Sequence, residues 1–188
     1  MPSKALWDYG TREHLEGIDL ILSCGDLPQK YLEYLTNFTA APILYVHGNH
    51  DGSYRENEPG GCICVDDSVY VWKGLRIMGL GGSQRYNKED TYQYTEKAMR
   101  RRAHKLEHQA HKKGGIDLLL THAPAKGLNS MTTVPVWRCH LLLAPIWCMS
   151  LKVIRCLAEP SGIICCSAIP MLLRPRCMMS CILPVPTS

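Results

Sequence analysis

The feature that most constrains the fold is a set of three short apolar segments, each followed by polar residues. The segments are Ile18–Ser23, Ile43–Val46 and Ile116–Leu120. Such short, mostly apolar runs are typical of strands buried on both faces of a sheet. The residues that follow them are Gly25-Asp26, Gly48-Asn49-His50-Asp51 and Thr121-His122. Because ligands gather at the carboxyl edge of the strands in α/β sheets, we expect these polar side chains to meet at one edge.

Two segments between these strands have the periodicity of amphipathic helices. In Gln29–Asn37, three large side chains fall on one side: Tyr31, Leu32 and Leu35. Thr95–Lys113 is longer, with a capping Thr95 and a Gly114-Gly115 pair that ends it. Its apolar stripe consists of Met99, Ala103, Leu106 and Ala110.

A hairpin is predicted in the middle of the chain. Val69–Trp72 and Leu75–Met78 flank Lys73-Gly74, which suits a tight turn between paired strands. Gly79–Ser83 is predicted to be a loop, and it lacks the Lys-Ser/Thr of a phosphate-binding loop. Strands alternating with helices predict an α/β sandwich around a mixed sheet.

The composition changes near residue 130. Residues 131–188 hold seven of the ten Cys, seven of the twelve Pro and one of the fifteen Gly. They show no clean period of 2 or 3.6, and proline interrupts both helices and strands. We therefore expect two regions: a partial α/β domain over residues 1–130 and a Cys/Pro/Met-rich tail of doubtful structure over residues 131–188.

Charge and hydropathy exclude two classes of partner. Basic and acidic residues balance in residues 1–130, so no broad basic face for nucleic acid is expected. Arg100-Arg101-Arg102, with His104, His108 and His111, is interpreted as a solvated helix face. The chain has no signal peptide pattern and no apolar run long enough to span a membrane, so we predict a cytoplasmic protein. The sequence leaves the oligomeric state open.

The residue types at the strand ends suit a divalent cation. Asp26 offers carboxylate oxygens, Asn49 an amide oxygen and His122 an imidazole nitrogen. Two cations bridged by Asp26 would polarise a phosphoryl group and ionise a water. His50 would then donate to the phosphoryl or leaving oxygen, with Asp51 holding its tautomer.

Other metal-competent residues are interpreted as structural. Cys62 and Cys64 would share one face of a strand, and nothing in the sequence supplies further ligands. The tail cysteines lack paired C-x₂-C spacing, which argues against a zinc module there. His47 is expected to be a structural or substrate-edge residue.

These blocks resemble those of the calcineurin-like metallophosphoesterases. Gly25-Asp26, Gly48–Asp51 and Thr121–Pro124 are similar to the second, third and fourth blocks of that family. The run from Leu20–Leu27 through Gly61–Cys64 and Gly79–Gly82 resembles a bacterial branch, and the resemblance covers about residues 3–130.

The resemblance implies a function and a set of roles. It implies an enzyme that hydrolyses small phosphomonoesters or phosphodiesters with divalent metals, often manganese, iron or zinc. By that resemblance Asp26 is the bridging ligand, and Asn49 and His122 bind the second metal. His50 is then the catalytic histidine and Asp51 its orienting partner.

Two family blocks have no counterpart in the sequence. No Asp-x-His block precedes Pro2, and residues 131–188 hold one histidine, His140, outside any Gly-His-x-His pattern. We therefore expect a chain that lacks the first family strand and carries a frameshifted or foreign tail, with at most one weakly held metal. The alternatives are a catalytically inactive remnant and a membrane-associated or Cys-rich interaction protein built on the tail.

Overall fold

The computed structural model describes residues 7–8, 12–87, 91–123, 152–154 and 163–166. The helical elements in these ranges are η1 (Arg12–Leu15), α2 (Gln29–Thr36), η2 (Gly52–Arg55) and α3 (Glu96–Lys112). The strands are β1 (Leu20–Ser23), β2 (Ile43–Tyr45), β3 (Cys62–Cys64), β4 (Ser68–Trp72), β5 (Leu75–Leu80), β6 (Ser83–Gln84), β7 (Gln93–Tyr94), β8 (Leu118–Thr121), β9 (Lys152–Ile154) and β10 (Ile163–Cys166).

The strands form two four-stranded mixed sheets and a small ribbon. The first sheet has the order β10-β1-β2-β3, with β1, β2 and β3 parallel and β10 antiparallel to β1. The second has the order β4-β5-β8-β9, with an antiparallel β4-β5 hairpin and parallel β5, β8 and β9. The ribbon pairs β6 with β7. The predicted mixed-sheet α/β class is confirmed.

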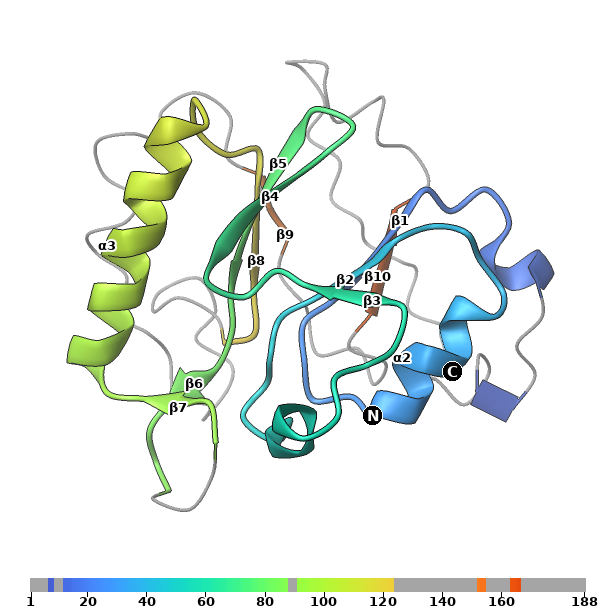
Figure 1. Cartoon of the computed structure of the whole chain (residues 1–188), viewed down its shortest axis with the longest axis horizontal. Coiled ribbons are helices and arrows are strands. Elements are labelled where there is room, and N and C mark those ends of the chain that lie inside the picture. The colour runs from blue at the N-terminus through green and yellow to red at the C-terminus, as the bar shows by residue number, and fades with distance from the viewer. Residues whose placement is uncertain (1–6, 9–11, 88–90, 124–151, 155–162, 167–188) are drawn as a thin grey trace, which may run out of the picture.

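Side chains that alternate along the strands divide the core into three apolar clusters, which lie between four layers of helices and sheets. On β1, Leu20 and Leu22 face the second sheet and pack with Ile77 and Leu120, whereas Ile21 packs on the other side with α2. On β5, Met78 and Leu80 pack under α3. The order of layers is therefore α2, first sheet, second sheet, α3, and Figure 1 shows the two helices at opposite sides of the molecule.

Both predicted helices are confirmed. The hydroxyl of Thr95 accepts from the backbone N of Ala98 at 3.2 Å, which caps α3. The predicted apolar stripe of α3 is buried at all four positions. On α2 the buried residues are Tyr31, Leu32 and Leu35, as their spacing predicted.

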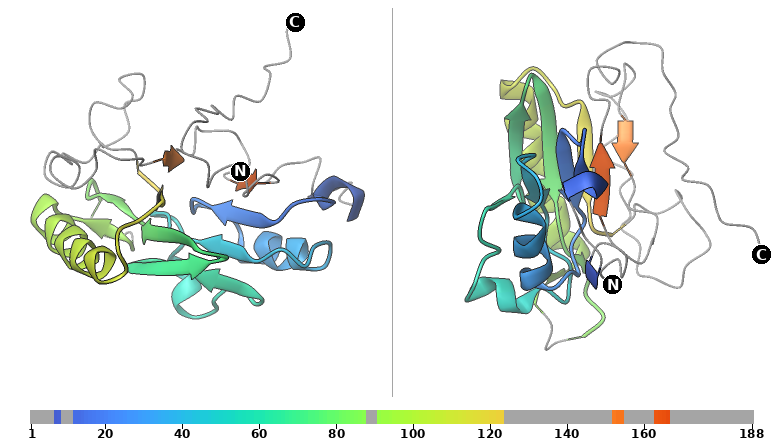
Figure 2. Two further views of the ribbon diagram at one scale, coloured as in Figure 1. Left: turned by 90° about the horizontal axis from the view of Figure 1, so that it is seen from above. Right: turned by 90° about the vertical axis from the view of Figure 1, so that its right-hand side faces the viewer.

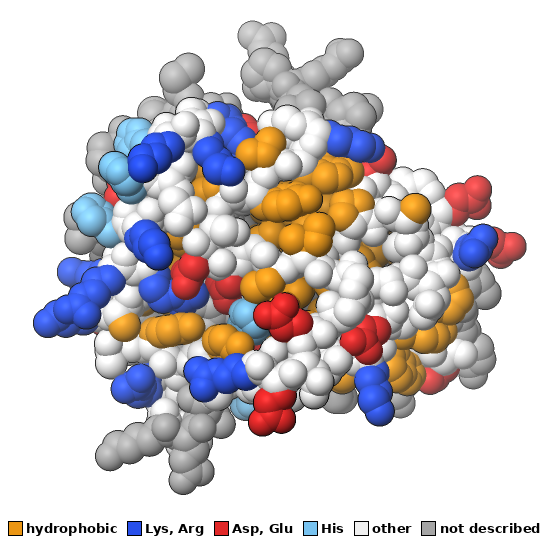
Figure 3. All heavy atoms as spheres, in the orientation of Figure 1, with side chains coloured by type: hydrophobic (Ala, Val, Ile, Leu, Met, Phe, Trp, Pro, Cys, Tyr) orange, Lys and Arg blue, Asp and Glu red, His pale blue; other side chains and the backbone are white. Residues whose placement is uncertain are grey.

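The outer face of α3 is exposed, as predicted, with one exception. Figure 3 shows Lys, Arg and His side chains along this edge of the molecule, and the His104 side chain is 88% exposed. Arg102, however, is only 13% exposed and pairs with Asp66 and Asp67. The interpretation of Arg102 as part of a solvated face is wrong, because it lies on the flank of α3 that packs against the sheet.

One expectation about strands is corrected, and part of the tail forms strands. The predicted loop Gly79–Ser83 holds the last two residues of β5 and the first of β6, because Gly79 and Leu80 continue the parallel pairing with β8. The tail, whose structure was doubtful from the sequence, supplies β9 and β10, one to each main sheet (Figure 2). Strand pairing supplied by the rest of the fold overrides the absence of local periodicity there.

No helix in the described ranges is long and apolar enough to cross a membrane. His140 and most of the tail cysteines lie outside the described residues, and so does the rest of residues 131–188 apart from β9 and β10.

Candidate metal centre

Three strand ends from two different sheets meet at one place. Asp26 follows β1, Asn49 follows the adjacent parallel strand β2, and His122 follows β8 of the second sheet. The two sheets are joined there by a hydrogen bond of 2.7 Å between the His122 Nδ1 and the Cys24 backbone carbonyl. The structure thus brings together Asp26, Asn49 and His122, the three residues that the sequence singled out as metal ligands.

The hydrogen bond to Cys24 determines the tautomer of His122. A carbonyl oxygen only accepts, so Nδ1 carries the proton, and in the neutral ring Nε2 presents a lone pair. Nε2 lies 3.2 Å from the Asn49 Oδ1 and 3.6 Å from the Asp26 Oδ2. A ring nitrogen held by a backbone carbonyl on its other side is a common arrangement among metal-binding histidines.

The donor set fits a divalent cation. When the His122 ring is neutral, its Nε2, the Asn49 Oδ1 and the Asp26 Oδ2 face one another as three electron-pair donors with no hydrogen between them. A cation bound there would relieve their mutual repulsion. Oxygen and imidazole ligands together suit manganese, iron or zinc. Among the described residues no group of three or more His, Cys, Asp and Glu is arranged to hold a metal. The candidate site here has two such residues, Asp26 and His122, and its third donor is the Asn49 amide.

The loops that carry Asp26 and Asn49 leave no room for larger side chains. Gly25 has φ +90°, and a Cβ there would overlap the Gly48 backbone. A Cβ at Gly48 would overlap the carboxylate of Asp26. Asp26 itself has φ +58°, an uncommon conformation for a residue with a side chain. The two glycines therefore allow the close approach that places Asp26 beside Asn49.

Asp51 ties the two loops together. It is buried, and its Oδ2 accepts hydrogen bonds from the backbone N of Gly48 at 2.7 Å and of Asp26 at 2.9 Å. Burial raises the pKa of its carboxyl group, while these two hydrogen bonds oppose the rise. The role predicted for Asp51, orienting the His50 ring, stays a prediction.

His50 lies at the exposed side of the centre. Its backbone N donates to the Asp26 Oδ1 at 2.9 Å, and its side chain is exposed to solvent. This contact fixes the backbone of His50 next to a candidate ligand. The catalytic role predicted for His50 also stays a prediction.

Sequence reasoning missed Tyr86, which contacts a candidate ligand. The Nδ2 of Asn49 donates to the Tyr86 hydroxyl at 2.8 Å. Tyr86 follows β6 and is 37 residues from Asn49 in the chain. No local pattern could have linked the two residues, because their contact depends on how the β6-β7 ribbon packs beside the loop after β2.

A second missed group is the ion-pair network behind the loop after β2. His47 is nearly buried, and its Nδ1 lies 2.8 Å from the Asp66 Oδ2. Arg102 reaches Asp66 from α3 at 3.2 Å and donates to the Gly81 carbonyl at 2.8 Å. The ring of His47 also stacks on Tyr92, with centroids 4.1 Å apart. The expectation of a structural role for His47 agrees with these contacts.

The pair His47–Asp66 has shifted pKa values. Burial lowers the pKa of His47, but the hydrogen bonds with Asp66 and Cys64 outweigh it and raise the pKa to about 9. Burial raises the pKa of Asp66, but the hydrogen bonds from His47 and Gly81 and the charge of Arg102 lower it overall. The pair is therefore charged at neutral pH.

Comparison with known proteins agrees with the family resemblance of the three strand-end blocks. A family model described as calcineurin-like phosphoesterase matches residues 3–153. The match extends beyond residue 130, where the resemblance seen in the sequence ended, and into β9. No curated protein matches the chain.

Proposed function

The chain belongs to the calcineurin-like phosphoesterase family, and from that premise we propose that it hydrolyses small phosphomonoesters or phosphodiesters with a divalent cation. In this proposal Asp26, Asn49 and His122 hold the cation. We extend the proposal to a cytoplasmic location and to a catalytic domain in residues 1–130 that is followed by the tail, residues 131–188.

The observation that carries the proposal is the convergence of three potential ligand atoms from three strand ends. The Nε2 of His122 faces the oxygens of Asn49 and Asp26, and its other ring nitrogen is held by the Cys24 carbonyl. Manganese, iron and zinc all accept such ligands, and three protein donors leave positions open for water and substrate. When bound, the cation would polarise a phosphoryl oxygen and lower the pKa of the attacking water.

The remaining steps are assigned to residues of this chain. His50 is proposed to donate a proton or hydrogen bond to the phosphoryl or leaving oxygen, since its backbone is fixed to Asp26 and its side chain is exposed. Asp51 is proposed to hold the loops after β1 and β2 next to each other and, as the sequence predicted, to orient His50. The Asp51 carboxylate supports the first role through its bonds to Gly48 and Asp26.

The test is hydrolysis of p-nitrophenyl phosphate and bis-p-nitrophenyl phosphate in Mn²⁺, Zn²⁺ or EDTA. We expect activity that requires metal and falls about a hundredfold or more in His50→Ala, with Mn²⁺ binding retained. His104→Ala, on the exposed face of α3, serves as the control and keeps full activity.

The two substrates separate monoesterase from diesterase activity. Metal binding that raises the melting temperature without turnover of either ester would support the alternative, a catalytically inactive member of the family. Absence of metal binding would contradict the proposed site itself.

A further inference from the structure

Tyr86 is an exposed aromatic side chain beside the candidate metal centre. The large hydrophobic residues that are exposed in the described part of the chain are Trp7, Val71 and Tyr86, and Tyr86 is the most exposed of them, at 56%. Its hydroxyl lies 2.8 Å from the Asn49 Nδ2. Because the nitrogen and oxygen of an amide are about 2.2 Å apart, that hydroxyl is at most about 5 Å from the Asn49 Oδ1. A largely exposed ring therefore stands within reach of a molecule that binds at the centre.

The backbone that carries this ring is fixed. The backbone N of Tyr86 donates to the Oε1 of Gln93 at 3.0 Å, and the backbone N of Asn87 donates to the same oxygen. Gln93 is buried in β7, and Arg85 donates from its backbone N to the Tyr94 carbonyl at 2.9 Å. A tyrosine on a fixed backbone has only two side-chain torsions left to order when a ligand packs on its ring. The ring is therefore a preformed contact surface.

The candidate ligands are largely covered, whereas Tyr86 and His50 are exposed beside them. Asn49 is 7% exposed, and the side chains of His122 and Asp26 are 17% and 32% exposed. A phosphoryl group bound at these ligands would extend its ester group toward solvent, on the side where the exposed residues lie. His50 presents a polar ring there, and Tyr86 presents an apolar one. An apolar ester group that covers the Tyr86 ring removes apolar surface of both from water.

We propose that the ring of Tyr86 packs against the ester group of the substrate, and that the centre therefore prefers phosphoesters with a flat aromatic group. The inference rests on the proposed function and deepens it, because it names the class of ester. The tyrosine hydroxyl is not required for this contact, since the ring alone provides the apolar face.

The test compares the binding of phenylphosphonate and methylphosphonate to the full chain in Mn²⁺, measured by isothermal titration calorimetry. Both compounds carry a phosphonate group and no ester bond that could be hydrolysed, and only the first has a ring. We expect the wild type to bind phenylphosphonate about tenfold more tightly than methylphosphonate, and Tyr86→Ala to retain a preference of about twofold or less. Tyr86→Phe keeps the ring and should keep the preference. Comparing variants cancels the difference in acidity between the two compounds.

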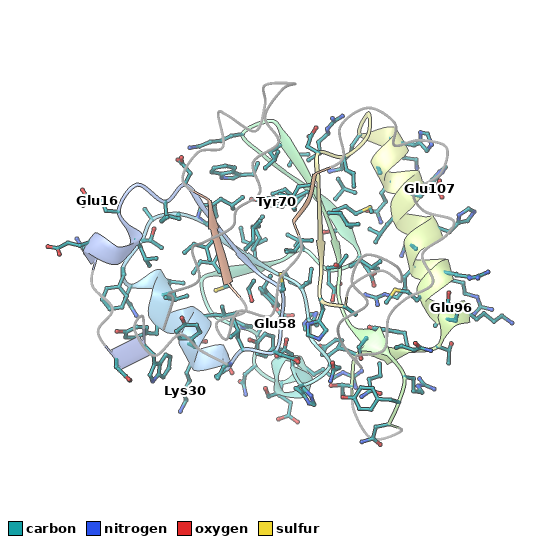
Figure 4. The ribbon with its side chains drawn as sticks, turned by 180° about the vertical axis from the view of Figure 1, so that it is seen from behind. Glu16, Lys30, Glu58, Tyr70, Glu96 and Glu107 are labelled. Atoms are coloured by element: carbon teal, nitrogen blue, oxygen red, sulfur yellow. The ribbon has the colours of Figure 1, made fainter. Side chains whose placement is uncertain are left out.

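Val71→Ala is the matched control, because it removes exposed apolar surface from β4. Figure 1 and Figure 4 show that β4, with Tyr70 next to Val71 in the chain, lies away from the β6-β7 ribbon. This variant should keep the tenfold preference. Methylphosphonate should bind to the wild type and all three variants within about twofold, and the melting temperature of Tyr86→Ala without metal should stay within about 2 °C, because the ring is largely exposed.

Three outcomes would overturn the inference and leave the proposed function standing. They are equal binding of the two phosphonates by the wild type, a preference that persists in Tyr86→Ala, and a preference lost in Tyr86→Phe as completely as in Tyr86→Ala. The last would assign the effect to the hydroxyl rather than to the ring. If the wild type binds neither phosphonate in Mn²⁺, the proposed function fails and the inference fails with it.

Discussion

At the scale of single residues, the candidate centre depends on two glycines that no larger residue can replace. Gly25 and Gly48 touch across the two loops, and each has a neighbour where its Cβ would lie. Gly25 also has a positive φ, whereas the requirement at Gly48 is for space alone. The close approach of Gly25 to Gly48 also brings the Asp26 carboxylate beside the Asn49 amide, so the site depends on these two glycines.

Gly48→Ala tests this close approach. The added methyl group would overlap the Asp26 carboxylate, so the loop after β2 must shift. We expect a loss of about 1–3 kcal/mol in the free energy of unfolding and at least tenfold weaker Mn²⁺ binding. Urea denaturation and metal titration measure the two effects. Gly60→Ala is the matched control, since a Cβ there would meet its nearest neighbour, the Glu33 Oε1, at 3.4 Å, and this variant should bind Mn²⁺ as the wild type does.

Asp66→Asn tests the buried ion pairs behind the site. Removing the carboxylate leaves His47 and Arg102 without their shared partner, and we expect a loss of about 3 kcal/mol in the free energy of unfolding near neutral pH. Asp67→Asn should cost much less, because the Asp67 side chain is 45% exposed.

The stability advantage of the wild type over Asp66→Asn should depend on pH. The pKa of Asp66 is lowered in the folded state. Its contribution to the free energy of unfolding is therefore present above about pH 3.8 and is lost as the pH falls through the lowered pKa. The pKa of His47 is raised to about 9, so its contribution is complete below 6.5 and is lost as pH rises through 9. Urea denaturation from pH 3 to 10 should show the largest difference between pH 4 and 6.5, and a constant difference would contradict the assignment.

At the scale of elements, α3 is capped by Thr95 at its first turn and contributes Arg102 to the ion pairs around Asp66. The helix is fixed by its buried stripe on one side and by Arg102, whose guanidinium also lies over the Tyr94 ring at 3.9 Å. Its exposed side contributes the charged and histidine side chains seen in Figure 3. The cap and the apolar stripe could be predicted from local sequence, but the partners of Arg102 could not.

Thr95→Ala tests the cap of α3. The variant leaves the backbone N of Ala98 without the Thr95 hydroxyl, and we expect a loss of about 1 kcal/mol in the free energy of unfolding. Thr95→Ser keeps a hydroxyl and should remain within about 0.5 kcal/mol of the wild type in the same urea titration. Equal losses in both variants would show that the methyl group matters rather than the hydrogen bond.

At the scale of the whole molecule, the candidate centre lies where the two sheets meet. Asp26 and Asn49 come from the first sheet and His122 from the second, so one cation would bind groups from both. The Cys24–His122 hydrogen bond joins the same strand ends. Metal binding should therefore stabilise the packing of one sheet on the other.

Thermal unfolding with and without Mn²⁺ tests this coupling. At a hundredfold excess over the dissociation constant, a ligand that binds only the folded state adds about 2.7 kcal/mol. For a chain of this length we expect a rise of roughly 5 °C or more in the melting temperature. His122→Ala should abolish the rise, whereas His108→Ala, on the exposed face of α3, should leave it intact.

The family and the strand-end ligand candidates followed from local sequence alone. Three apolar runs with Gly25-Asp26, Gly48–Asp51 and Thr121-His122 at their ends predicted buried strands and candidate ligands, because short-range periodicity and strand direction decide both. The helices followed for the same reason. The strands of the tail did not, since β9 and β10 exist through pairing with β8 and β1 rather than through their own pattern.

Only the tertiary structure decided which side chains surround the candidate ligands and the loop after β2. Tyr86 contacts Asn49 across 37 residues, Asp66 contacts His47 across 19, and Arg102 contacts Asp66 across 36. A hydrogen bond depends on a few ångströms of position, and over such separations that position is determined by the packing of whole elements. Local sequence could therefore predict the candidate ligands, but not the long-range contacts around them.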